Sequence, residues 1–88
     1  MKVLVLYRPH SEQGRLVDEF ERNFQSRYQN SRLEMLDVDS REGSAMASLY
    51  DIMSFPAILV LQTDGNLQQC WQGETLPLID EVAGYVNS

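Results

Sequence analysis

The chain has 88 residues, of which 43% are hydrophobic, and this size predicts a single domain over residues 1–88 with one modest core. We therefore do not expect a multidomain enzyme. Seven basic and thirteen acidic residues give a formal net charge of -6, the wrong sign for binding the phosphates of nucleic acids or of anionic lipids. We therefore expect neither nucleic acid nor a membrane surface as a partner.

The apolar run Val3 to Tyr7 is short, and no apolar run in the sequence is longer. A helix that spans a bilayer needs roughly 20 apolar residues, so this run does not predict one. The run is also shorter than the core of a signal peptide, and no small-residue cleavage site follows it. The expected location is therefore cytoplasmic.

The sequence contains one cysteine, Cys70. One cysteine cannot form an internal disulfide or a redox pair, and alone it cannot build a zinc site. The single histidine, His10, and the scattered carboxylates have no recognisable metal-ligand spacing. We therefore expect no metal and no cofactor.

The first half of the chain predicts a strand, a helix and a second strand. The continuous apolar run Val3 to Tyr7 is typical of a strand that is buried on both faces of a sheet. After Pro9, Ser11 can cap a helix. Leu33 to Val38 is a second apolar run, which a right-handed crossover would place parallel to the first. The apolar residues of the helix recur at helical spacing and are Leu16, Val17, Phe20, Phe24 and Tyr28.

A shorter second helix should follow, capped by Asp39 or Ser40. It must end before Phe55, because the residue that precedes Pro56 is pushed out of the helical region. Met35, Met46 and Met53 are expected to fill gaps in the core. The inner side of the helix is predicted to consist of Ala45, Leu49, Ile52 and Met53.

The last third predicts a hairpin and a closing helix. Ala57 to Gln62 and Leu67 to Gln72 are predicted to be antiparallel strands around the tight turn that Asp64-Gly65 favours. Gly73 ends the second of these strands, and Thr75 can cap the final helix. The predicted buried stripe of that helix is Leu78, Ile79, Val82, Tyr85 and Val86.

Four short motifs in this order resemble the thioredoxin family over nearly the whole chain. They are Asp37-Val38-Asp39, Phe55-Pro56-Ala57, Asp64-Gly65 and Trp71-Gln72-Gly73. The resemblance implies an α/β fold of order βαβαββα, with a four-stranded mixed sheet, helices on both faces and a cis-proline at Pro56. It also implies a minimal version of the fold, because the chain starts at the family's first central strand. A ferredoxin-like sandwich is the alternative, and it needs a strand where residues 75–86 predict a helix.

The chain departs from the family where its chemistry resides. Ser11-Glu12-Gln13-Gly14 stands where the resemblance places the redox Cys-x-x-Cys motif. The family's buried acid aligns with Val5, and the tryptophan before its first cysteine aligns with His10. A serine hydroxyl cannot replace the thiolate that attacks a disulfide. We therefore expect no dithiol-disulfide oxidoreductase activity and name no catalytic residue.

The resemblance also implies a groove for an extended peptide, in which the residue before the cis-proline offers its main chain. The first hypothesis is therefore a redox-inactive protein-binding or adaptor module. The groove residues would be His10, Ser11, Phe55, Pro56, Gln72 and Gly73.

Two alternatives remain open from the sequence. One is an enzyme, either a single-thiol redox protein that uses Cys70 or another activity at the groove. His10 is a weak candidate for a general base, because no nucleophile stands near it in the sequence. The other alternative is a structural subunit, which would form complexes or oligomers through the edge strand of the hairpin.

Overall fold

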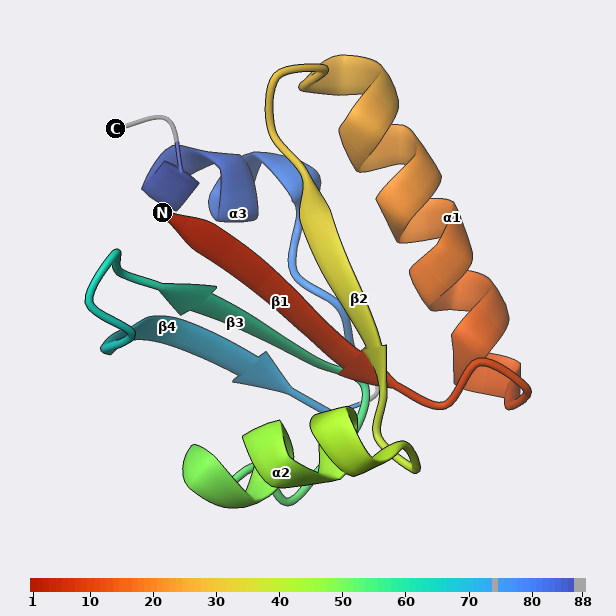
Figure 1. The fold of residues 1–88 in the computed structure, drawn as a ribbon. Helices are drawn as coiled ribbons and strands as arrows, with labels where there is room; N and C mark the ends of the chain where they lie inside the picture. The colour runs from red at the N-terminus through yellow and green to blue at the C-terminus, as the bar shows by residue number, and fades with distance from the viewer. Residues whose placement is uncertain (74, 87–88) are drawn as a thin grey trace.

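Four strands form one mixed sheet in the order β2-β1-β3-β4, with three helices packed around it (Figure 1). The computed structural model describes residues 1–73 and 75–86. β1 runs parallel to β2 and antiparallel to β3, and β4 is antiparallel to β3. The predicted order βαβαββα is confirmed. The elements are β1 (Lys2–Tyr7), α1 (Glu12–Arg27), β2 (Leu33–Asp37), α2 (Arg41–Leu49), β3 (Ala57–Leu61), β4 (Leu67–Gln72) and α3 (Ile79–Val86).

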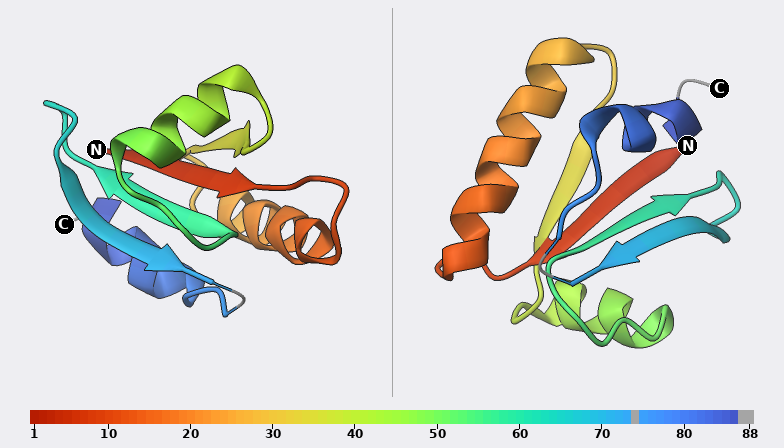
Figure 2. Two further views of the ribbon diagram at one scale, coloured as in Figure 1. Left: turned by 90° about the horizontal axis from the view of Figure 1, so that it is seen from below. Right: turned by 180° about the vertical axis from the view of Figure 1, so that it is seen from behind.

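Alternation along the central strands divides the core into two layers. Val3 and Val5 face α1 and α3, whereas Leu4 and Leu6 face α2. β3 divides in the same way, with Ile58 on the α1 side. Figure 2 shows α2 on one face of the sheet and the other two helices on the opposite face. Both central strands are buried on both faces, as their continuous apolar runs predict.

The helices α1 and α2 begin with the same arrangement of a serine and a glycine. Ser11 and Ser40 are the N-caps, and each side-chain oxygen accepts a hydrogen bond from the amide of the glycine three residues later. Both glycines are buried against the loop that enters the helix. A Cβ on Gly14 would lie closer than 3.0 Å to Pro9 O, and one on Gly43 closer than 3.0 Å to Asp37 O. The Ser-x-x-Gly pattern therefore lets each helix start tightly against the end of the preceding strand.

The inner face predicted for α2 is wrong in part. Ile52 is buried, but Ala45 is exposed, and Leu49 and Met53 are 69% and 84% exposed. The prediction assumed a helix that continued to Met53, whereas α2 ends at Leu49. The residues that pack inward are instead Gly43, Met46, Ala47 and Tyr50, which follow helical spacing from the true start of α2.

Two predictions for α1 and α3 also need correction. Leu16 is 51% exposed. The buried residues of α1 form a narrower stripe along the helix than the sequence predicted, and Leu16 lies outside that stripe. α3 starts at Ile79, so Thr75 is not its cap, and Leu78 is 70% exposed. Pro77 interrupts the approach to the helix. The Glu81 carboxylate accepts a hydrogen bond from the Leu78 amide at 3.2 Å. This is one of the two hydrogen bonds of a capping box, with Leu78 at the N-cap position.

Asp80 joins the start of α3 to the end of α1. Its Oδ1 accepts hydrogen bonds from the Tyr28 hydroxyl at 2.6 Å and from Arg27 Nη1 at 3.1 Å. The Tyr28 hydrogen bond, followed by the Arg27 contact, holds the pKa of the Asp80 carboxyl below its usual range.

This link predicts an acid-dependent contribution to stability. A lowered pKa in the folded state stabilises the protein above the unfolded-state pKa of about 4, and the effect is lost as the pH falls through the folded pKa. We expect Asp80→Asn to be less stable than the wild type at pH 7, with the difference shrinking below pH 4. Urea unfolding of both proteins from pH 2 to 7 measures it. A difference that does not change with pH would contradict this assignment.

Within the two described ranges, no helix is both long enough and apolar enough to cross a membrane.

Candidate functional site

The candidate groove lies where β1 ends and β3 begins. A hollow of about 50 Å³ is lined by the loop after β1, the first turn of α1 and the Phe55-Pro56 segment. The peptide bond between Phe55 and Pro56 is cis. Three of the predicted groove residues, Ser11, Phe55 and Pro56, meet here, together with Arg8 and Gln13, which the sequence did not indicate.

Ser11 is occupied by its role as a helix cap. Its hydroxyl donates to Arg8 O at 2.6 Å and accepts from the Gly14 amide at 3.2 Å. The hydroxyl therefore binds the chain's own main chain on both sides. Ser11 lines the hollow, and because its hydroxyl proton is donated to Arg8 O, the hydroxyl is not free to act as a nucleophile.

Gln72 and Gly73 brace the segment that leads into Pro56. The side-chain oxygen of Gln72 accepts hydrogen bonds from the amides of Met53 at 3.1 Å and Ser54 at 3.3 Å. The amide of Gly73 donates to Pro56 O at 3.1 Å. These two residues therefore stabilise the segment from Met53 to Pro56, but they do not line the hollow.

Phe55 has a main chain that is open for pairing. Among residues 1–73 and 75–86, no hydrogen bond involves its amide or its carbonyl. Its ring is half-buried against the α2 layer of the core. The Arg8 guanidinium lies 5.4 Å from the centre of that ring, and Arg8 Nε is 3.5 Å from the Asp39 carboxylate. The ring is thus fixed by packing and by Arg8, while the peptide groups on either side stay available.

His10 lies outside this hollow. Its side chain is exposed, and it lines a separate, shallow depression with Ser11, Glu12, Arg15 and Leu16. The only hydroxyl among these residues is the one that caps α1. The arrangement gives His10 no nucleophile to activate.

Cys70 lies in β4, opposite Leu59 of β3, and packs partly against the α2 layer of the core. Burial raises the pKa of its thiol, and a hydrogen bond from Gln72 offsets this only in part. Less thiolate is therefore present at neutral pH than in an exposed cysteine, and the thiolate is the reactive form.

Native Cys70 is expected to react with iodoacetamide at pH 7.5 more slowly than the same cysteine in urea-unfolded protein. Burial protects the thiol and keeps it protonated. The rate in the folded protein should rise with pH to above pH 9, because the pKa is raised. Mass spectrometry of timed samples measures both rates, and faster labelling of the folded protein would show that Cys70 is activated.

The outer side of β4 is partly closed by one of its own side chains. Gln69 Oε1 accepts a hydrogen bond from the Cys70 amide at 2.8 Å, and Gln69 Nε2 donates to the Tyr85 hydroxyl at 3.0 Å. An edge strand recruits another strand through unpaired main-chain groups. Since the amide in the middle of β4 is already paired, this edge is less suited to docking than the sequence suggested.

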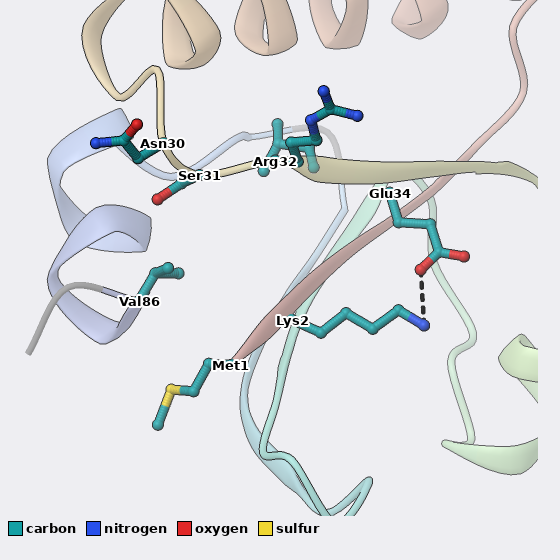
Figure 3. Close-up of a pocket in the computed structure, with 8 residues that line it drawn as sticks. Met1, Lys2, Asn30, Ser31, Arg32, Glu34 and Val86 are labelled. Carbon is teal, nitrogen blue, oxygen red and sulfur yellow. Dashed lines mark ion pairs between the residues drawn. The ribbon is translucent and has the colours of Figure 1, made fainter.

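A larger hollow of about 560 Å³ lies at the opposite end of the sheet, where β1 and β2 begin. Figure 3 shows the Lys2 side chain directed to Glu34, with which it forms an ion pair of 2.7 Å. The Arg32 side chain points away from Lys2 in the same view. The two cations therefore do not converge on a common ligand. In the described part of the chain, no three histidine, cysteine or acidic side chains are grouped so that they could hold a metal ion.

The chain has the thioredoxin fold, as its likeness to solved structures shows. It resembles thioredoxin O2 from Arabidopsis thaliana with a TM-score of 0.70 at 12% identity, over 98% of this chain and 71% of that one. For thioredoxin 1 from Thermosipho africanus the TM-score is 0.68 at 13% identity, over 99% of this chain and 91% of that one. For the germline-specific thioredoxin Deadhead from Drosophila melanogaster the TM-score is 0.71 at 15% identity, over 97% of this chain and 76% of that one. No protein family and no curated protein matches at the sequence level.

The predicted fold class is therefore confirmed. At these low identities the shared fold does not carry the activity of those proteins over to this chain.

Proposed function

We propose that this chain is a redox-inactive thioredoxin-like domain that binds an extended protein segment at Phe55. The observation that carries the proposal is the open main chain of Phe55 beside Pro56, on a segment that Gln72 and Gly73 hold in place. An extended segment could pair with the Phe55 amide and carbonyl as a short strand does. No cofactor takes part.

Two features support a binding role without thiol chemistry. The only cysteine is Cys70, and its raised pKa disfavours the thiolate. The second position of the lost motif is Gly14, whose Cβ space is filled by main-chain atoms of the entering loop. Binding would therefore be non-covalent and indifferent to reducing agents.

The size of the hollow limits what the partner can insert. A volume of about 50 Å³ suits a small side chain such as alanine or serine. Each main-chain hydrogen bond contributes only about 0.5–1.5 kcal/mol net. Recognition would thus depend on the extended main chain and on contacts at the rim, with Gln13 and Arg8 as the nearest side chains.

Gln13→Arg tests the proposal without removing a cap or a brace. Gln13 lines the hollow, and no hydrogen bond to its side chain is found within the described residues. Gln25→Arg on the same helix is the matched control, because it adds the same charge at a half-buried site outside the hollow. Tagged wild type and both variants are used to capture proteins from a lysate, with and without reductant.

A captured protein lost with Gln13→Arg, kept with Gln25→Arg and unaffected by reductant would support groove binding. Equal capture by all three proteins would overturn it. Capture seen only without reductant would move the function to Cys70.

A further inference from the structure

The sheet has a second edge at β2, opposite the edge at β4. Within the described residues β2 pairs with β1 alone, and it is the outermost strand on that side of the sheet (Figure 1). The Val38 amide, which directly follows β2, donates to Tyr7 O of β1 at 3.0 Å. Successive residues of a strand direct their main-chain groups to opposite sides, so the even-numbered residues of β2 face β1. Its odd-numbered residues, Leu33, Met35 and Asp37, therefore direct their amides and carbonyls outward.

Most of these outward groups are unpaired. Asp37 O accepts hydrogen bonds from the Ser40 amide at 3.0 Å and from the Ser40 hydroxyl at 2.6 Å. For the three outward amides and the other two carbonyls, no partner is found among residues 1–73 and 75–86. In β4, by contrast, Gln69 already pairs the amide of Cys70. Unpaired groups at every second residue are a template for a further strand, and β2 has neither the proline nor the bulge that would block one.

Both layers of the core end at this edge with a partly exposed side chain. Met35 packs against the α1 layer and Leu36 against the α2 layer, and each is half-buried. Figure 2 shows α1 and α2 on opposite faces of the sheet, so apolar surface borders β2 on both faces. A strand added beside β2 would place alternate side chains next to Met35 and next to Leu36. It would cover both only if it were apolar on both faces, as β1 and β3 are.

A second copy of this chain fits the edge poorly. Antiparallel pairing of two β2 strands about Met35 would set Glu34 of each copy opposite Leu36 of the other. The Glu34 side chain is exposed and forms an ion pair of 2.7 Å with Lys2. Moving this carboxylate against an apolar side chain would cost solvation energy, and two copies that each carry a net charge of -6 also repel. The edge therefore suits a segment of another protein better.

We propose that the outer edge of β2 takes up an extended segment of a partner protein as a fifth strand of the sheet, and that this segment is apolar on both faces. Its main chain would pair with Met35 and with the outward residues on either side. Its side chains would continue both layers of the core. This binding does not depend on peptide pairing at Phe55, and different variants test the two sites.

A synthetic peptide with the sequence of residues 2–8, KVLVLYR, is the probe, because this sequence already pairs with the inner side of β2. The control peptide KTLTLYR keeps the shape and the end charges but makes one face polar. Each peptide is titrated into the isotope-labelled full chain and followed by NMR. We expect shifted signals and slower hydrogen exchange at the amides of Leu33, Met35 and Asp37. The Kd of the control peptide should be higher by about tenfold, from the loss of two apolar contacts.

Met35→Pro tests the edge from the side of the protein. It removes an outward amide and no hydrogen bond to β1, and proline is tolerated on an edge strand at such a position. The Kd of KVLVLYR should rise by about tenfold, because the central donor is lost and the ring crowds the edge. Met35→Leu is the matched control, since it keeps the amide and an apolar side chain, and its Kd should equal that of the wild type.

A third peptide keeps the test open if Met35→Pro does not fold. It is KVLVLYR with N-methyl groups on its four central residues, so it has the same side chains without the main-chain donors, and it should not bind the wild type. Binding of this peptide, equal Kd values for KVLVLYR and KTLTLYR, or unchanged signals from the three outward amides would overturn the proposal. Signals that shift only around Phe55 and that Gln13→Arg abolishes would overturn it and support the groove. A dimer of the protein alone that Met35→Pro abolishes, seen by sedimentation, would replace the partner with a second copy.

Discussion

Gly43→Ala is expected to destabilise the protein by about 3 kcal/mol, the upper end of the range for forcing an extra group into filled space. The added Cβ would lie closer than 3.0 Å to the carbonyl of Asp37, which cannot move without disturbing the end of β2. That carbonyl also accepts hydrogen bonds from the amide and hydroxyl of Ser40. Gly14→Ala should have a smaller effect of the same sign, about 2 kcal/mol, because Pro9 lies in a loop.

Gly84→Ala is the matched control. Gly84 lies in α3, and an added Cβ there would meet no described atom within 4 Å, so alanine should stabilise that helix by up to about 1 kcal/mol. Urea unfolding gives the free energy of unfolding of each of the three variants. The dependence of this free energy on urea concentration should be the same for all of them. A neutral or stabilising Gly43→Ala would show that the start of α2 is looser than the structure has it.

Phe24→Ala is expected to cost about 3–5 kcal/mol, the usual loss for a buried phenylalanine. Phe24 is fully buried in the α1 layer of the core. Its ring centre is 6.3 Å from that of Phe20 and 5.4 Å from that of Tyr28. Since small domains are stable by only about 5–15 kcal/mol, the variant should be close to unfolding at 37 °C.

Leu16→Ala on the same helix should change the free energy of unfolding by less than about 0.5 kcal/mol, as surface substitutions do. Leu16 is 51% exposed, and alanine is the better helix former. Thermal unfolding followed by circular dichroism compares the two variants. Equal losses for both would mean that the side of α1 assigned to the core is wrong.

Most of the fold was predictable because its patterns are local. The continuous apolar runs of β1 and β3, the serine caps and the Asp64-Gly65 turn each identify an element without reference to the rest of the chain. The end of α2 was missed because its left-handed residue is Asp51, where glycine would have marked the boundary. The start of α3 was missed because Thr75 resembles a cap, although the helix begins only after Pro77.

The candidate site was predictable only in part, because its contacts join distant residues. Ser11, Phe55 and Pro56 could be named from the motifs. That Gln72 braces the amides of Met53 and Ser54 depends on a side chain that reaches 18 and 19 residues back. The position of Arg8 in the sequence does indicate a place in the groove, because Arg8 directly follows the central strand β1 and so lies at the edge of the sheet where loops meet.

The close approach at Gly14 has a consequence for how this fold could change in evolution. A cysteine at position 11 would need only Ser11→Cys, since that residue already has a side chain at the mouth of the hollow. Gly14→Cys would place its Cβ against main-chain oxygens of the loop, where no rotamer of a neighbour can make room. A cysteine at position 14 would therefore require the loop before α1 to take a different path. Codon changes at positions 11 and 14 alone would therefore not give this backbone a Cys-x-x-Cys pair.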